Sequence, residues 1–162
     1  ISAGVMLLIK QPDQWELLKS NPEMYLPVLV EEILRLEGPV QGLFRETACD
    51  VEFHGVRIPK GSVINVRYAS ANLDDEIFEI PQELNLERAN ARQHLAFGFG
   101  THYCMGAPLA RREILLSFKV LLEKVDEMWF LEDLNDFKHH QNYCLRALRE
   151  LHIGFTKCDI SV

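Results

Sequence analysis

The sequence lacks paired cysteines, and this absence excludes two common kinds of small-domain framework. Its four cysteines, Cys49, Cys104, Cys144 and Cys158, include no CxxC pair. A structural zinc site is therefore not expected, and neither is a disulfide framework in a chain long enough to build a core. The pattern predicts a reduced, cytoplasmic setting.

Basic residues and long apolar runs are also lacking. The 17 Lys and Arg residues stand against 24 Asp and Glu residues, which gives a formal charge of −7. Nucleic-acid-binding proteins usually carry a basic surface, so we expect no nucleic acid partner. No apolar run reaches the roughly 20 residues of a membrane-spanning helix, and Ile1–Lys10 has neither a basic leader nor a cleavage-like end. We predict no membrane association and no signal peptide.

An initiator methionine is missing too, and the first residues are typical of the middle of an apolar helix. We interpret the chain as a fragment of a longer protein. Apolar residues over Val5–Ile9 predict the end of one helix. Pro12–Ser20 is predicted as a second helix, because a first-turn proline loses no hydrogen bond. A break follows at Asn21-Pro22, and we expect Pro27 to open a third helix that ends at Gly38-Pro39.

The middle of the chain changes to the alternation that is typical of strands. Val51–Phe53 and Val56–Ile58 flank a turn, and Ser62–Ala69 is rich in β-branched residues. These segments predict a small antiparallel sheet. One turn of helix is expected around Asp74–Phe78.

The last third contains one strong helix. Ala107–Lys124 has the apolar spacing of a buried helix, with Pro108 at its start. The tail, Glu127–Val162, predicts short strands and turns, of which Leu151–Phe155 is the best strand. The expected fold class is mainly α with small antiparallel β-sheets.

The segment that indicates chemistry runs from Phe97 to Gly106, with the sequence FGFGTHYCMG. Cys104 precedes a helix N-terminus, where free N–H groups and the helix dipole favour a thiolate, the form that ligates metals. Glycines allow close backbone approach here, and Phe97 offers an aromatic cover for a flat cofactor. A single thiolate suits an iron that four porphyrin nitrogens already hold. His102 and Cys104 as two zinc ligands are the alternative, which needs two more ligands from distant residues.

This segment resembles the cysteine-ligand loop of the cytochromes P-450, of the form FxxGxHxCxGxxLAR. Its fixed positions are met by Phe97, Gly100, His102, Cys104, Gly106, Leu109, Ala110 and Arg111. The histidine and the HLAFGFG lead-in resemble the soluble bacterial branch. The resemblance implies that residues 1–162 are the C-terminal, haem-binding part of a single cytochrome P-450 domain. It further implies that Cys104 is the axial ligand of the iron of haem b.

The resemblance also extends to a structural motif upstream. Glu32 and Arg35 form an ExxR pair, whose spacing places both side chains on one helix face. In the family, an arginine from the segment before the cysteine loop joins this pair. Arg88 is the better candidate, and Arg92 is the alternative.

Further contacts with cofactor, substrate and redox partner are implied by the same resemblance. Arg45 and His102 take the positions of groups that bind the haem propionates. Cofactor contacts are also implied for Phe97, Gly98 and Gly106. The residues implied to contact substrate are Val40, Leu43, Phe44, Cys144 and Leu145. Arg111 and Arg112 are candidates for a face that docks an acidic electron donor.

The implied function is that of a haem-thiolate monooxygenase, which inserts one atom of dioxygen into a small organic substrate. A ferredoxin-type donor would supply the electrons. The family's acid–threonine pair would lie upstream of Ile1, so we expect no catalytic residue here beyond the haem ligand. We therefore expect weak or no turnover from the isolated chain. The alternatives are a non-catalytic haem-binding fragment and a peroxide-using relative.

Overall fold

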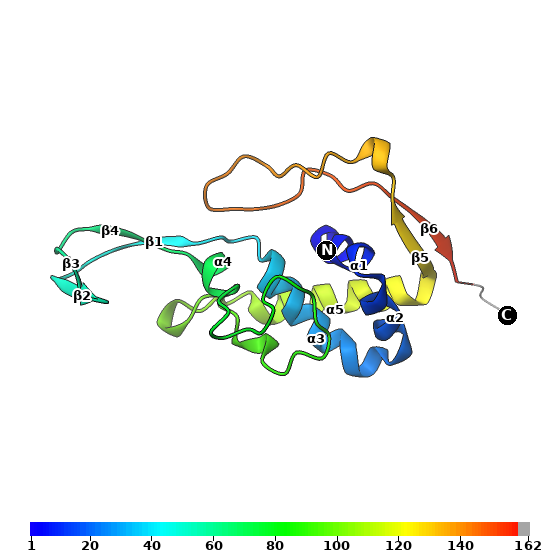
Figure 1. Ribbon diagram of the computed structural model, residues 1–162, viewed down its shortest axis with the longest axis horizontal. Helices are drawn as coiled ribbons and strands as arrows, with labels where there is room; N and C mark the ends of the chain where they lie inside the picture. The colour runs from blue at the N-terminus through cyan, green and yellow to red at the C-terminus, as the bar shows by residue number, and fades with distance from the viewer. Residues whose placement is uncertain (159–162) are drawn as a thin grey trace.

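The computed structural model describes residues 1–158 and is mainly helical, with three two-stranded antiparallel sheets. The helices are α1 (Ser2–Lys10), α2 (Pro12–Ser20), α3 (Pro22–Glu37), α4 (Tyr68–Ala71) and α5 (Ala107–Lys124), and the short 3-10 turns are η1 (Ala91–Gln93), η2 (Gly100–His102) and η3 (Glu132–Leu134). Figure 1 shows α1, α2, α3 and α5 gathered in one body, in which α3 packs against both α1 and α5. The predicted fold class is confirmed.

Helix α3 begins earlier than the sequence predicts. The prediction that Pro27 opens this helix is wrong, because Pro27 lies inside it. The true start is Pro22, and the side chain of Asn21 caps it by accepting the N–H of Met24 at 3.3 Å. A capped proline start is complete by itself. Pro27 removes only one intrahelical hydrogen bond near that start, so the helix continues through it.

Six short strands form the three ladders. They pair as β1 (Leu43–Glu46) with β4 (Val63–Val66), β2 (Val51–Phe53) with β3 (Val56–Ile58), and β5 (Val125–Phe130) with β6 (Ile153–Lys157). The β2–β3 hairpin turns at His54 and Gly55, whose φ angles are 48° and 76°. Two positive φ angles suit the twist of a two-residue hairpin turn. The first two ladders extend away from the helices at the left of Figure 1.

Two of three further segments differ from prediction. The strand predicted over Ser62–Ala69 ends at Val66, because the buried Tyr68 starts α4. The predicted single turn at Asp74–Phe78 is present, because the carbonyl of Asp74 accepts the N–H groups of Ile77 and Phe78, and no longer helix follows it. In the tail, the strand expected over Leu151–Phe155 occurs two residues later, as β6. The prediction of strands and turns over Glu127–Val162 includes residues 159–162, which lie outside the described residues.

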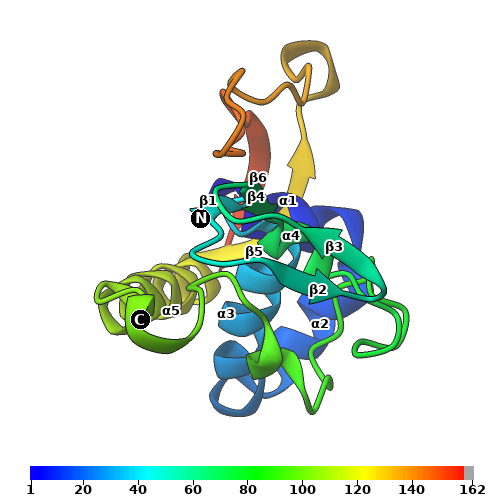
Figure 2. The same ribbon diagram turned by 90° about the vertical axis from the view of Figure 1, so that its left-hand side faces the viewer.

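The core lies between the four longer helices, and it fixes α3 against α5. Leu8, Leu18, Leu29 and Phe118 are fully buried there. The segment between β5 and β6 passes over this body and returns to it, as Figures 1 and 2 show. Among residues 1–158, no helix combines the length and the apolar character needed to cross a bilayer.

Candidate functional site

Cys104 lies in a tight loop between η2 and the N-terminus of α5. Its N–H donates to the carbonyl of Phe97 at 3.0 Å, and its own carbonyl accepts the N–H of Ala107 at 3.3 Å. Gly98 has a φ of 72°, which only glycine adopts without a Cβ penalty. Gly106 caps α5, and a Cβ there would lie 3.7 Å from the sulfur of Cys104. The loop thus presents an exposed thiol at the positive end of a helix of 18 residues.

A mostly apolar cavity of about 530 Å³ opens beside this sulfur. Its lining residues are Ile1, Ser2, Ala3, Ile33, Leu34, Glu37, Pro39, Val40, Leu43, Tyr68, Ala96, Phe97, Gly98, His102, Cys104, Ala110, Ile114, Arg146, Ala147 and Leu148. The cavity brings together four of the predicted cofactor residues, namely Phe97, Gly98, His102 and Cys104. Gly106 lies close to the sulfur but outside the lining.

The predicted propionate partner Arg45 does not line the cavity. It is exposed on β1, and its guanidinium donates to the carbonyl of Phe44 at 2.8 Å. His102 does line the cavity. The structure therefore does not bring Arg45 and His102, the two residues predicted to bind haem propionates, to the same wall of the cavity.

The two predicted substrate-contacting stretches lie side by side. Val40 forms a β-bridge with Leu145, and the carbonyl of Cys144 accepts the N–H of Gln41 at 2.7 Å. The ring of Phe44 stacks on Tyr143 with centroids 5.8 Å apart. Of the five candidates, Val40 and Leu43 line the cavity, and Phe44, Cys144 and Leu145 lie outside its lining.

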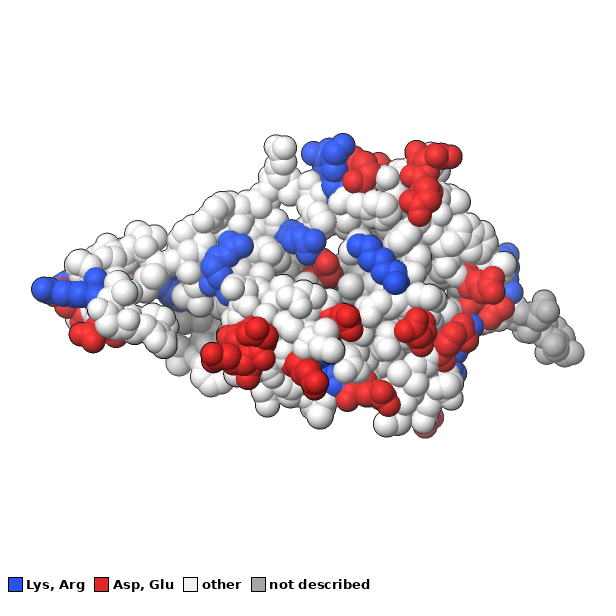
Figure 3. All heavy atoms as spheres, viewed as in Figure 1, with Lys and Arg blue, Asp and Glu red and all other residues white. Residues whose placement is uncertain are grey.

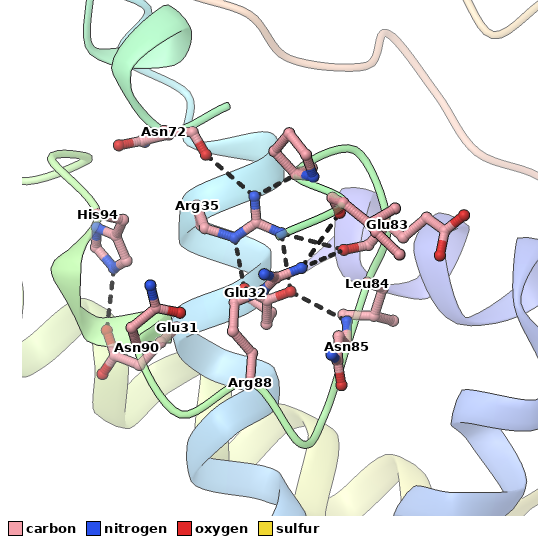
Figure 4. Close-up of polar contacts among 12 residues, drawn as sticks. Glu31, Glu32, Arg35, Asn72, Glu83, Leu84, Asn85, Arg88, Asn90 and His94 are labelled. Carbon is pink, nitrogen blue, oxygen red and sulfur yellow. Dashed lines mark hydrogen bonds and ion pairs between the residues drawn. The ribbon is translucent and has the colours of Figure 1, made fainter. Parts of the chain in front are cut away.

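Glu32, Arg35 and Arg88 form a buried ionic cluster (Figure 4). The Nε and Nη2 atoms of Arg35 donate to the two carboxylate oxygens of Glu32 at 2.5 and 2.9 Å. The Nε of Arg88 lies 3.1 Å from Glu32 Oε1, close enough for an ion pair but misaligned for a hydrogen bond. Backbone carbonyls accept further guanidinium protons, among them the carbonyls of Asn72 and Glu83. Because Arg88 takes this place, the alternative Arg92 stays on the surface, with 80% of its side chain exposed.

A second buried carboxylate, Glu31, was not singled out by the sequence. It accepts two parallel hydrogen bonds from Arg111, at 2.8 and 2.9 Å, and lies 3.0 Å from Nε2 of His94. Burial alone would raise the pKa of Glu31, but the hydrogen bonds from His94 and Arg111 and the charge of Arg111 lower it to about 2. The adjacent glutamates of the EEILR segment were the available signal, because two neighbouring carboxylates on a buried helix each need a partner.

These contacts correct the expectation for Arg111. The sequence suggested a docking surface, but its guanidinium is occupied by Glu31 and lies over the ring of Phe97 at 4.7 Å. Its neighbour Arg112 is exposed and remains a candidate.

Comparison with known proteins settles the family. Residues 9–127 match the family model described as Cytochrome P-450. The chain belongs to the cytochrome P-450 family. Among relatives, cytochrome P-450 CYP107DY1 of Priestia megaterium is 39% identical over 155 residues, which cover 96% of this chain and 37% of that protein. The steroid C26-monooxygenase of Mycobacterium tuberculosis is 38% identical over 82% of this chain and 35% of its own length.

Solved cytochrome P-450 structures have the same fold over the matched part of the chain. The substrate-free form of Mycobacterium marinum cytochrome P-450 CYP150A6 has a TM-score of 0.90 and 34% identity, over 96% of this chain and 40% of that one. The chain therefore spans little more than a third of the length of the curated relatives it matches.

Cytochromes P-450 bind haem b, and the donor set of the site fits such a group. Within residues 1–158, no cluster of three or more His, Cys, Asp or Glu side chains would hold a bare metal ion. The zinc alternative for His102 and Cys104 thus finds no further ligands in that part of the chain. An iron already held by four porphyrin nitrogens needs only one sulfur from this face. The apolar wall beside Cys104 offers that sulfur and a surface for a flat macrocycle.

Proposed function

We propose that residues 1–162 are the C-terminal part of a single cytochrome P-450 domain, and that Cys104 is the axial ligand of its haem iron. The whole protein would be a haem-thiolate monooxygenase. The observation that carries this proposal is the exposed sulfur of Cys104 on the wall of an apolar cavity, at the N-terminus of α5. When bound, haem supplies the activation of dioxygen.

The residues of this chain hold and orient the group. The N-terminus of α5 favours the thiolate form of Cys104, since the helix dipole stabilises negative charge there. Phe97 and Gly98 line the cavity with the sulfur, and Gly98 has no side chain that would separate the backbone from a bound group. His102 would donate to a propionate from that wall, and Arg45 would do so from β1 after its guanidinium leaves the carbonyl of Phe44.

The substrate side of the proposal rests on apolar residues. Val40 and Leu43 line the cavity. Cys144 and Leu145 pair with residues 40–41, and Phe44 stacks on Tyr143, so these three lie next to the lining. Such a surface suits a small, mainly apolar organic substrate, because its burial removes apolar area from water. Dioxygen is the co-substrate.

The electron donor in this proposal is of the ferredoxin type, and the location is the cytoplasm. Arg112 is exposed near the cysteine loop and would contact an acidic donor. All four cysteines are free, which fits a reducing compartment.

The test uses the full-length protein that carries this chain, loaded with haem. Small apolar compounds that change its absorption spectrum on binding are offered with a ferredoxin, its reductase and isotopically labelled dioxygen. A monooxygenase gives a hydroxylated product that carries one labelled oxygen atom, and product requires the reductase. Product formation with hydrogen peroxide but never with the reductase would instead identify a peroxide-using relative. Haem binding without product under either condition would identify a non-catalytic haem-binding protein.

A further inference from the structure

Arg111 connects a buried carboxylate to two residues that hold the cysteine loop. Its Nε and Nη2 atoms donate to Glu31, whose side chain is only 3% exposed. Its Nη1 donates to the hydroxyl of Tyr103 at 2.9 Å, and its guanidinium lies 4.7 Å from the ring centroid of Phe97. Arg111 thus contacts Tyr103, which precedes Cys104, and Phe97, whose carbonyl accepts the N–H of Cys104.

The other side of Glu31 is held by His94. The N–H of Ala96 donates to Nδ1 of His94 at 3.1 Å, so the proton of the imidazole lies on Nε2, which donates to Glu31. His94 and Ala96 lead directly into the cysteine loop. Glu31 therefore connects α3 to α5 and to the segment that precedes the cysteine loop. The adjacent Glu32 binds Arg35 in a separate cluster.

We propose that Arg111, held by Glu31, is a positioning residue for Cys104. It fixes Tyr103, which precedes Cys104, and Phe97, whose carbonyl accepts the N–H of Cys104, and so fixes where the sulfur points. The inference rests on the proposed role of Cys104 as haem ligand. Planar bidentate binding, stacking on Phe97 and a third bond to Tyr103 together need a guanidinium, which an ammonium does not replace.

The deciding variant is Arg111→Lys, which keeps the positive charge but loses the planar guanidinium that makes two parallel hydrogen bonds to Glu31. Lys119→Arg is the charge-conserving control on the same helix, because Lys119 is exposed. Both are made in the full-length, haem-loaded protein. The readout is the carbon-monoxide difference spectrum, in which the thiolate-ligated population is measured relative to the population that has lost the thiolate. Because the variant loses charge-assisted hydrogen bonds, we expect this ratio to fall about tenfold or more in Arg111→Lys and to be unchanged in Lys119→Arg.

Tyr103→Phe is a second, gentler variant, since it removes only the hydroxyl that Arg111 contacts. We expect a smaller fall in the same ratio, together with a changed midpoint potential of the iron. A merely structural ion pair would lower the melting temperature and haem content while the haem that is bound kept a wild-type ratio and potential. That outcome in both variants overturns the inference, and if Arg111→Lys does not fold, a wild-type ratio and potential in Tyr103→Phe alone overturns it. If the wild-type protein itself shows no thiolate-type spectrum, the proposed function fails, which is a distinct result.

Discussion

Two adjacent carboxylates, Glu31 and Glu32, are buried on α3, and different arginines neutralise them. Glu32 is matched by Arg35 and Arg88, and Glu31 by Arg111. A buried charge without a partner lowers the stability of the folded state by several kcal/mol. Removal of either the glutamate or its arginines would therefore leave the other buried without a counter-charge. At the scale of single residues, these pairs determine how the irregular segment and the cysteine loop are attached to α3.

The first prediction concerns the cluster around Glu32. Glu32→Gln leaves two guanidinium groups buried without a full counter-charge, so we expect the free energy of unfolding to fall by about 3–5 kcal/mol. Urea titration of the full-length protein, followed by circular dichroism, measures it. Glu23→Gln is the control, because Glu23 is exposed on the same helix, and its effect is expected within about 0.5 kcal/mol. Equal effects of the two substitutions would contradict the assignment.

The second prediction concerns pH and Glu31. The pKa of Glu31 is lowered from 4.5 to about 2 in the folded protein, so the folded state favours the ionised form. Its contribution, on the order of 3 kcal/mol, is complete above pH 4.5 and is lost as the pH falls towards 2. The groups that face it are Arg111, His94 and, at 3.7 Å, Arg92.

The difference in unfolding free energy between wild type and Glu31→Gln is therefore expected to be largest above pH 4.5 and to shrink towards pH 2. Acid titrations of both proteins, each followed by circular dichroism, measure this difference. A difference that is constant over that range would show that the carboxylate has no lowered pKa.

At the scale of elements, the close approach of α1 to α3 and α5 depends on one glycine. Gly4 is buried, and a Cβ there would overlap the side chain of Ile33 and lie 2.7 Å from Phe118. No ordinary contact is that short, so a larger residue pushes the helices apart. This packing holds α5, and with it the N-terminus behind Cys104.

We therefore expect Gly4→Ala to lower the free energy of unfolding by about 1–3 kcal/mol, despite the better helix propensity of alanine. Thermal unfolding of the full-length protein tests this, and Ser2→Ala at the exposed start of the same helix is the control. A melting temperature of Gly4→Ala at or above that of wild type would mean that α1 does not pack as closely as described.

Elements with local signals were predictable from the sequence. Pro12–Ser20 and Ala107–Lys124 have the predicted bounds, because each has a proline in its first turn and apolar spacing along its length. The start of α3 was wrong because two prolines competed, and the capping side chain of Asn21 decided it. Strand β1 was not predicted, since its four residues are exposed and only pairing with β4 defines it.

In the site too, features that are local in the sequence could be predicted, and contacts between distant residues could not. The loop around Cys104 was predictable because its glycines and its helix start are local in the sequence. The partner of Glu31 was not, because Arg111 is distant in the chain and meets it only after α3 packs against α5. Arg88 was preferred over Arg92 by resemblance, and the fold of residues 79–88 around it explains that preference physically.

At the scale of the whole molecule, the largest group of acidic side chains lies away from the cysteine-side cavity, whose lining includes one ion pair, Glu37 with Arg146. Acidic side chains gather on the lower part of the face in Figure 3, where the segment between α4 and η1 passes, and the exposed residues there are Asp74, Asp75, Glu76, Glu79, Glu83 and Glu87. The cavity beside Cys104 is mostly apolar instead. A mostly apolar wall with one sulfur suits the flat ring of a macrocycle better than a bare metal ion.

The most direct test of the central claim is the carbon-monoxide difference spectrum of the full-length protein. We compare wild type with Cys104→Ala and, as a control, with Cys144→Ala, whose cysteine lies at the edge of the site outside the cavity lining. The account predicts a thiolate-type band in wild type and Cys144→Ala and its complete loss in Cys104→Ala. Retention of that band in Cys104→Ala would contradict the assignment of Cys104 as the ligand of the iron.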